Sequence, residues 1–136
     1  MIVDVNIILS ALMKDSTSRE IIIKSELDFC FPEVSLHKIE KYRGLILEKS
    51  GLTDEELNAL LKMLFQCIRL IPAEGLMRYW DESMKIMEHI DTEDVPFIAA
   101  ALSQQTSIWS EDRHFEKQKR IRCFKTEEVL ELCKKV

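Results

Sequence analysis

Four acidic residues from separate stretches of the sequence could together form a metal site, namely Asp4, Glu40, Asp94 and Asp112. Asp4 interrupts a run over residues 2–9 that is otherwise aliphatic apart from Asn6, a pattern typical of a strand buried on both faces. A carboxylate there costs several kcal/mol unless it is neutralised, hydrogen-bonded or bound to a cation. Taken alone, the stretch fits a structural role equally well, with Asp4 and Asn6 closing the strand and capping the next turn.

Asp94 stands at the start of a predicted helix, on the side that the helix buries. Residues 94, 97 and 98 fall in one helical column, so Asp94 shares a face with Phe97 and Ile98. The helix dipole stabilises an acid in the first turn by a few tenths to about 1 kcal/mol, which suffices to explain Asp91 as an N-cap. It explains less well an acid on the apolar side, and Asp94 is therefore a candidate for function.

Asp112 directly follows a predicted strand over residues 106–110. Ligands of parallel α/β sheets bind outside the carboxyl ends of the strands, so Asp4 and Asp112 are expected to face one crevice. Glu40 and Asp94 belong to helices that pack there. Converging carboxylates raise one another's pKa unless cations lie between them, and oxygen ligands of this kind select Mg²⁺ or Mn²⁺. The chemistry that such a site serves is attack of metal-activated water on a phosphodiester.

The elements that must position these acids alternate between strand and helix along the chain. Strands are predicted at residues 2–9, 28–31, 67–71, 106–110 and 120–124. Helices are predicted over residues 17–26, 36–49, 53–64, 76–90, 95–105 and 126–135. This alternation, with short connections, predicts an α/β fold in which helices cover a parallel sheet, as one domain over residues 1–136.

Local signals mark the ends of several predicted helices. Thr17–Glu20 and Thr53–Glu56 have the form of capping boxes. Ser35 and Thr126 are placed to cap the helices that follow them, and Gly51 is placed to end the second helix.

Composition limits the class of protein. The 136 residues are 46% hydrophobic and 32% charged, which indicates a folded chain rather than a disordered one. No apolar run approaches the ~20 residues that span a bilayer, and no basic region precedes the apolar start. We therefore expect a cytoplasmic protein without membrane contact. The four cysteines lack the paired spacing of a zinc site.

A basic strip over residues 113–125 contrasts with the net charge of −5. The strip contains several Lys and Arg residues but a single acid, Glu116. Such a strip can follow the phosphates of a nucleic acid, although a solvated turn is the commoner role. Arg113 and Lys117, close to Asp112, are the candidates for contacting nucleic acid.

The histidines His37, His89 and His114 are not paired with one another at helical spacing. A surface or structural role is expected for each, with His114, two residues after Asp112, the best candidate for an exception. Hydrolysis by metal-activated water needs no base from the protein.

Four stretches, in order along the chain, resemble the motifs of the PIN-domain family. They are Ile2–Leu12 with Asp4, Ser35–Tyr42 with Glu40, Asp91–Leu102 with Asp94, and Ser110–Phe115 with Asp112. Each motif is weak singly, but together they are fairly specific and cover essentially the whole chain. One departure is Gln-Gln-Thr-Ser-Ile-Trp at residues 104–109, where such domains usually carry a Gly-Ala or Gly-Cys turn into an aliphatic strand.

The resemblance implies a small three-layer α/β/α fold and Mg²⁺- or Mn²⁺-dependent cleavage of single-stranded RNA. Members of this family often form homodimers, and many small members are toxins paired with an antitoxin protein, so the resemblance makes a homodimer and an antitoxin partner the expected ones. Asp4, Glu40, Asp94 and Asp112 would be the catalytic acids, with Asp4, Asp94 and Asp112 as metal ligands. Asn6 and Ser110 would support them by hydrogen bonding. Asp91 and Glu111 are further acids, either of which could replace a ligand.

Two other functions fit the same sequence. A catalytically weak module that binds nucleic acid or protein would keep these acids only as caps or weak metal ligands. A phosphate-accepting receiver or phosphatase-like domain could use Asp4 as its nucleophile. It would also need a lysine just after a later strand, and residues 106–112 offer none.

Overall fold

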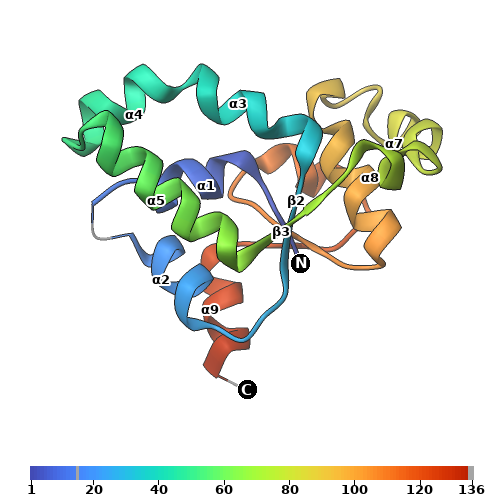
Figure 1. Ribbon diagram of the computed structural model, residues 1–136. Helices are drawn as coiled ribbons and strands as arrows, with labels where there is room; N and C mark the ends of the chain where they lie inside the picture. Colours follow the sequence, from blue (N-terminus) through green and yellow to red (C-terminus); the bar gives the residue numbers. More distant parts are fainter. Residues whose placement is uncertain (15, 135–136) are drawn as a thin grey trace.

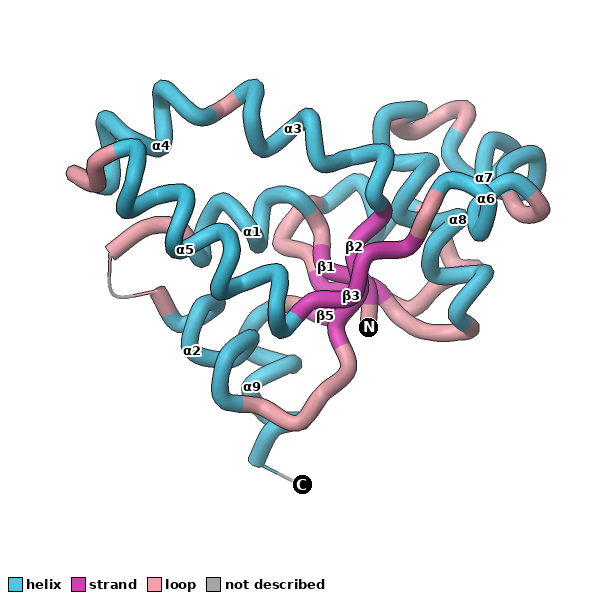
Figure 2. The backbone as a smooth tube through the Cα atoms, viewed as in Figure 1, coloured by secondary structure: helices cyan, strands magenta, loops and turns pink. Residues whose placement is uncertain are grey.

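A five-stranded parallel sheet forms the middle of the molecule. The computed structural model describes residues 1–14 and 16–134. The strand order is β3-β2-β1-β4-β5, and every neighbouring pair is parallel. The strands are β1 (Ile2–Val3), β2 (Phe29–Pro32), β3 (Ile68–Ile71), β4 (Ile108–Trp109) and β5 (Cys123–Phe124). Figure 2 shows how short they are beside the helices.

Helices connect the strands and cover both faces of the sheet. The α-helices are α1 (Val5–Ala11), α2 (Thr17–Lys24), α3 (Leu36–Lys41), α4 (Arg43–Ser50), α5 (Asp54–Cys67), α6 (Ala73–Met77), α7 (Trp80–Met87), α8 (Val95–Gln104) and α9 (Thr126–Lys134). Three short 3₁₀ helices are η1 (Glu33–Ser35), η2 (Thr92–Asp94) and η3 (Arg113–Lys117). Within residues 1–14 and 16–134, no helix has the length and apolarity that crossing a membrane requires.

The helices form two layers with the sheet between them. Helix α8 packs on β1, β2 and β4, with α6 and α7 against it. Figure 1 shows these three helices to the right of the sheet and α1, α2, α5 and α9 to the left, with α3 and α4 crossing above it. The predicted three-layer α/β/α fold with a central parallel sheet is confirmed.

The first predicted strand is much shorter than expected, because the run over residues 2–9 divides at Asp4. The Asp4 carboxylate accepts a hydrogen bond from the Val5 N–H and caps helix α1. Ile7 and Ile8 are buried on that helix. An N-cap and a buried face thus override the preference of β-branched residues for strands.

Other boundaries also differ from the sequence predictions. Ser16, not Thr17, caps α2, because its hydroxyl accepts the Arg19 N–H. The helix predicted over residues 36–49 is broken at Tyr42, and Ser35 makes no capping bond with its side chain. The predicted helix over residues 76–90 is likewise two helices, α6 and α7.

Two of the sequence signals are confirmed in full. Thr53 and Glu56 form a reciprocal capping box at the start of α5. Gly51 ends α4 with φ 74°, a left-handed conformation that glycine adopts without steric cost.

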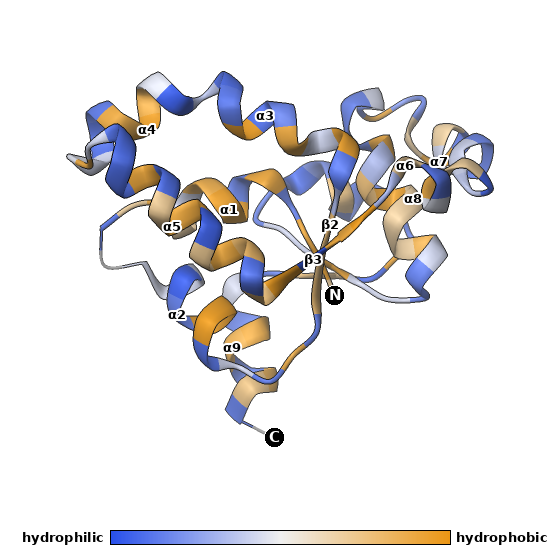
Figure 3. Ribbon diagram, in the orientation of Figure 1, coloured by the Kyte–Doolittle hydropathy of each residue, from blue (hydrophilic) through white to orange (hydrophobic). Residues whose placement is uncertain are grey.

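Buried aromatic rings join the sheet to the helix layer on its right. Phe31 of β2 meets Phe97 of α8 edge-to-face, with centroids 5.6 Å apart, and Phe97 meets Phe115 of η3 at 6.4 Å. All three rings are fully buried. In Figure 3 the strands and the inner faces of the helices are mostly hydrophobic. This packing fixes where α8 and η3 begin, and the candidate site lies at those two starts.

Candidate metal centre

Asp4 lies between β1 and α1 and is almost completely buried, with 1% of its surface exposed. One carboxylate oxygen, Oδ1, accepts the Val5 N–H at 2.8 Å, and the other, Oδ2, accepts the Ser110 hydroxyl at 2.7 Å. Both oxygens are therefore held in fixed directions at the carboxyl edge of the sheet.

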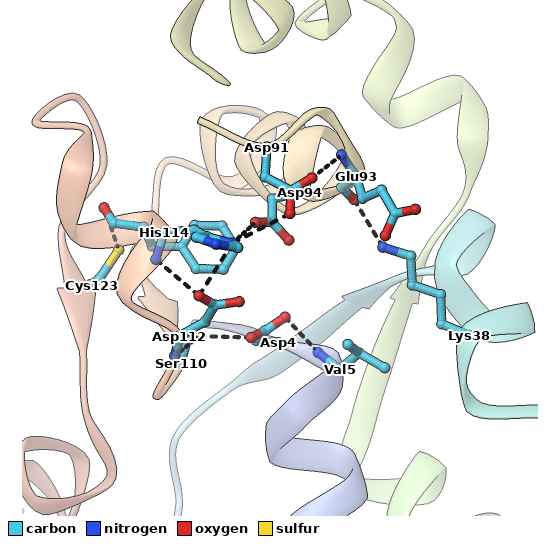
Figure 4. Close-up of polar contacts among 11 residues, drawn as sticks. Asp4, Val5, Lys38, Asp91, Glu93, Asp94, Ser110, Asp112, His114 and Cys123 are labelled. Carbon is cyan, nitrogen blue, oxygen red and sulfur yellow. Dashed lines mark hydrogen bonds and ion pairs between the residues drawn. The ribbon is translucent and has the colours of Figure 1, made fainter. Parts of the chain in front are cut away.

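Ser110 and Asp112 follow β4, the neighbour of β1. The Ser110 hydroxyl oxygen accepts the Asp112 N–H at 2.9 Å while its own proton is donated to Asp4. Asp112 caps η3, since its Oδ1 accepts the His114 N–H at 2.9 Å. A continuous polar chain thus links Asp4 through Ser110 to Asp112 (Figure 4).

Asp91 and Asp94 approach the same place from the start of α8. Asp91 caps η2 through the Glu93 N–H, as predicted, whereas the buried Asp94 makes no capping bond. Nδ1 of His114 lies 3.3 Å from Asp91 Oδ2, 3.4 Å from Asp94 Oδ2 and 3.3 Å from Asp112 Oδ1. Figure 4 shows the imidazole between these carboxylates.

Two buried atoms at the centre of this cluster lack hydrogen-bond partners among the described residues. They are Asp94 Oδ2 and His114 Nδ1. Buried polar atoms are rarely left unpaired, because each forfeits its bonds to water. One ligand atom each from Asp91, Asp94 and His114 lie within 4.8 Å of one another. Carboxylate oxygens are the donors that Mg²⁺ and Mn²⁺ prefer, and an imidazole nitrogen is a donor typical of later transition metals, so the residues present fit a divalent ion.

The electrostatics of the cluster favour an added cation. Burial, and then the neighbouring charges of Asp4, Asp91 and Asp112, raise the pKa of Asp94 to about 7. Burial also raises the pKa of Asp4, against the lowering effect of its hydrogen bonds from Ser110 and Val5. A divalent ion would relieve the repulsion that raises both values.

Not every predicted site residue joins the cluster. Glu40 is exposed on α3, and its carboxylate lies 3.7 Å from Arg43 Nε. It is not among the charges that shift the pKa of Asp4 or Asp94, whereas Asp112 acts on both. Asn6 is exposed on the first turn of α1, and Glu111 accepts the Thr126 N–H at the start of α9.

Sequence reasoning underrated one residue and missed another. His114, expected at the surface or in a structural role, reaches the centre of the cluster from η3. Lys38, on the helix that was expected to bring Glu40, instead points toward the start of α8 (Figure 4). The two-residue spacing between His114 and Asp112 was a usable signal, but the sequence of the helix predicted over residues 36–49 did not show which side of it would face the site.

The family model for the PIN domain matches residues 2–131 of the 136-residue chain. The chain belongs to the PIN-domain family. PIN domains are generally metal-dependent nucleases, and a cluster able to hold a metal ion is present in this PIN domain. No match to a curated protein was found for the chain.

Proposed function

We propose that this PIN domain is an endoribonuclease that hydrolyses phosphodiester bonds of single-stranded RNA with Mg²⁺ or Mn²⁺. The observation that carries the proposal is the buried Asp94 Oδ2, which lies 3.4 Å from His114 Nδ1; within residues 1–14 and 16–134 neither atom has a hydrogen-bond partner. Asp91, Asp94, Asp112 and His114 would hold the ion, and Asp4 would complete its surroundings. A bound divalent ion supplies a water of lowered pKa and positive charge for the leaving oxygen.

The hydrogen bonds of the cluster serve this function by fixing the ligands in place. Ser110 joins Asp4 to the Asp112 backbone, and capping bonds hold Asp91 and Asp112 at the starts of η2 and η3. Such fixed ligands reduce the reorganisation needed when metal and substrate bind.

Exposed basic residues beside the cluster are placed to receive the RNA backbone. Arg113 and Lys117 lie on η3, the element that also carries His114, and both are exposed. Two other residues of the basic strip instead pair with acids of the protein, with Arg120 at 3.5 Å from Glu82 and Lys125 at 3.3 Å from Glu116. We infer that Arg113 and Lys117 contact phosphates, so replacing either with Gln should weaken RNA binding and reduce its salt dependence.

The test is cleavage of end-labelled single-stranded RNA by the purified protein. Cleavage should appear with Mn²⁺ or Mg²⁺, stop with a chelator and fall strongly in Asp94→Asn. Duplex RNA and single-stranded DNA of the same sequence serve as substrate controls. Metal-independent cleavage, or undiminished cleavage by both Asp94→Asn and Asp4→Asn, would refute the proposal.

The cellular role that the family resemblance implies, a homodimeric toxin held by an antitoxin, has its own tests. Induced expression should arrest growth, and the Asp94→Asn variant should not. Co-expression of the adjacent open reading frame should restore growth if it encodes the antitoxin. Sedimentation of the purified chain should give twice the monomer mass.

One observation favours the second candidate, a catalytically weak binding module. Two basic side chains, His114 and Lys38, lie beside the acidic cluster and could balance part of its charge without a metal. The predicted acid Glu40 does not join the cluster. A module of this kind would bind RNA without cutting it and would show no saturable Mn²⁺ binding that Asp94→Asn removes. Mn²⁺ titration of the wild type and this variant separates the two functions.

A further inference from the structure

Helix α3 brings a cation, not a carboxylate, to the acidic cluster. The Lys38 ammonium donates a hydrogen bond to the Glu93 carbonyl oxygen at 2.9 Å, across 55 residues of sequence. It also lies 5.5 Å from the centroid of the Phe97 ring, in cation–π range. Figure 4 shows the lysine reaching from α3 to the turn that carries Asp94. These two contacts hold the charge beside the first turn of α8.

Lys38 acts electrostatically on the two most buried acids of the site. The pKa values of Asp4 and Asp94 are raised chiefly by burial, and the Lys38 charge opposes that rise in both, more weakly than the neighbouring acids act on Asp94. Glu40, two residues along the same helix, is turned to solvent and pairs with Arg43. The Lys38 ammonium, held at the Glu93 carbonyl next to Asp94, thus places a positive charge beside this end of the cluster.

A fixed ammonium changes how many divalent ions the cluster can accept. An ion on the Lys38 side would be repelled by the ammonium, and α3 supplies no carboxylate there to compensate. An ion near Asp91, Asp94 and His114 would keep the ligand atoms that lie within 4.8 Å of one another. We propose that this PIN domain binds a single divalent ion and that Lys38 takes the place of a second one, facing the phosphodiester with its ammonium.

This inference rests on the proposed metal-dependent function and says which charges serve it. A merely structural role for Lys38, tying α3 to η2 through the Glu93 carbonyl, is the competing explanation. The two differ in what a charge-conserving change does. Lys38→Arg keeps the positive charge, whereas Lys38→Gln keeps a hydrogen-bond donor but removes the charge.

The experiment is a titration of the purified full chain with Mn²⁺. Calorimetry measures the binding, and the electron paramagnetic resonance signal measures the Mn²⁺ that remains free. The wild type and Lys38→Arg should each bind one Mn²⁺ per chain with similar affinity. Lys38→Gln should bind Mn²⁺ roughly tenfold more tightly, because a like charge near the ion is gone. Lys38→Glu should bind a second Mn²⁺.

The matched control is Lys41→Gln, which makes the same change one turn along α3 at an exposed position. Its Mn²⁺ affinity should stay within about twofold of the wild type, since exposed charges are strongly screened. Thermal unfolding of every variant in chelator verifies that each is folded before titration.

Each unexpected outcome of the Mn²⁺ titrations contradicts a different part of the proposal. Two Mn²⁺ ions per wild-type chain, or equal Mn²⁺ affinity in Lys38→Gln and the wild type, would overturn the inference and leave the nuclease proposal standing. Parallel shifts in Lys38→Arg and Lys38→Gln would show that Lys38 is only a structural tether. No Mn²⁺ binding by the wild type would refute the metal-dependent function itself, and this inference with it.

Discussion

Charged residues are paired and exposed at one edge of the central sheet, whereas at the other edge acidic residues are buried. At the amino edge, Asp28 precedes β2 and its carboxylate lies 3.1 Å from Arg69 of β3. Arg69 also donates to Gln104 at 3.1 Å, and the Met1 ammonium donates to the Asp28 carbonyl oxygen. At the carboxyl edge, Asp4 and Asp94 are buried, and Asp94 Oδ2 has no hydrogen-bond partner among the described residues.

The difference distinguishes an edge whose charges balance one another from an edge whose acids are able to hold an added ion. Charges at the amino edge balance one another within the protein and stay in contact with solvent, where a single pair contributes little to stability. At the carboxyl edge the acids outnumber the basic groups and are removed from water, which costs folding free energy. Such local cost is expected where function, rather than stability, decides the residues.

The largest expected effect is on RNA cleavage. Asp94→Asn or Asp4→Asn should lower the rate of Mn²⁺-dependent cleavage roughly 100-fold or more, since either removes a charge from the metal surroundings. Asp28→Asn, the same change at the amino edge, should leave the rate within about twofold. Initial rates on labelled RNA measure all three. Equal losses in Asp28→Asn and Asp94→Asn would show that the edges do not differ in function.

The metal-free protein should become less stable as pH rises. Burial and the neighbouring acids raise the pKa of Asp94 from its ordinary value of 3.8 to about 7, so between these pH values the folded state holds a proton that the unfolded chain has released. The free energy of unfolding should then fall by on the order of a few kcal/mol as pH rises from about 4 through 7. Asp4, whose pKa is also raised by burial, adds to the fall.

Urea unfolding at several pH values in chelator measures this dependence. Asp94→Asn should flatten it and be more stable than the wild type near pH 8, because a neutral amide replaces a repelled carboxylate. Asp28→Asn should keep the wild-type slope. Saturating Mn²⁺ should reverse the trend in the wild type, since metal binds the deprotonated acids. A wild-type stability that rises from pH 4 to pH 7 in chelator would contradict the assignment.

A third comparison sets one buried hydroxyl against one exposed ion pair. Ser110→Ala removes the donor to Asp4 and the acceptor of the Asp112 N–H, both at the carboxyl edge. It should cost about 1–3 kcal/mol near pH 7, because Asp4 keeps its burial and loses a bond. Arg69→Gln at the amino edge should cost less than about 1 kcal/mol. Urea unfolding compares them, and a larger loss in Arg69→Gln would reverse the ranking.

The sequence predicted the architecture because alternation of strands and helices is a local pattern. Buried runs, the capping box at Thr53 and the helix end at Gly51 are each encoded within a few residues, so the parallel α/β arrangement followed from them. The division of residues 2–9 at Asp4 did not, because a β-branched run fits a strand and a buried helix alike until its partners are known. The break at Tyr42 depends on tertiary packing in the same way.

The candidate site was predictable in part for a related reason. Asp4 directly follows β1 and Asp112 lies three residues after the end of β4, so parallel topology alone brings them to one edge. Glu40 and Lys38 differ by two residues on one helix, a rotation of about 200° at 3.6 residues per turn. Only the packing of α3 decides which of them faces Asp94, and the structure selects Lys38.

The departure from the usual glycine-containing turn at residues 104–109 leads to the smallest prediction. Gln105 ends α8 with φ 51°, so a residue with a side chain adopts the left-handed conformation that glycine favours. This backbone costs a non-glycine residue about 1 kcal/mol. Gln105→Gly should therefore raise the free energy of unfolding by about 0.5–1 kcal/mol, with some of the gain offset by the greater freedom of glycine in the unfolded chain.

The control is Gln104→Gly, within α8, which should lower the free energy of unfolding by a similar amount; urea midpoints would distinguish the two variants. A loss of stability in Gln105→Gly would mean that contacts of the Gln105 side chain outweigh its backbone strain.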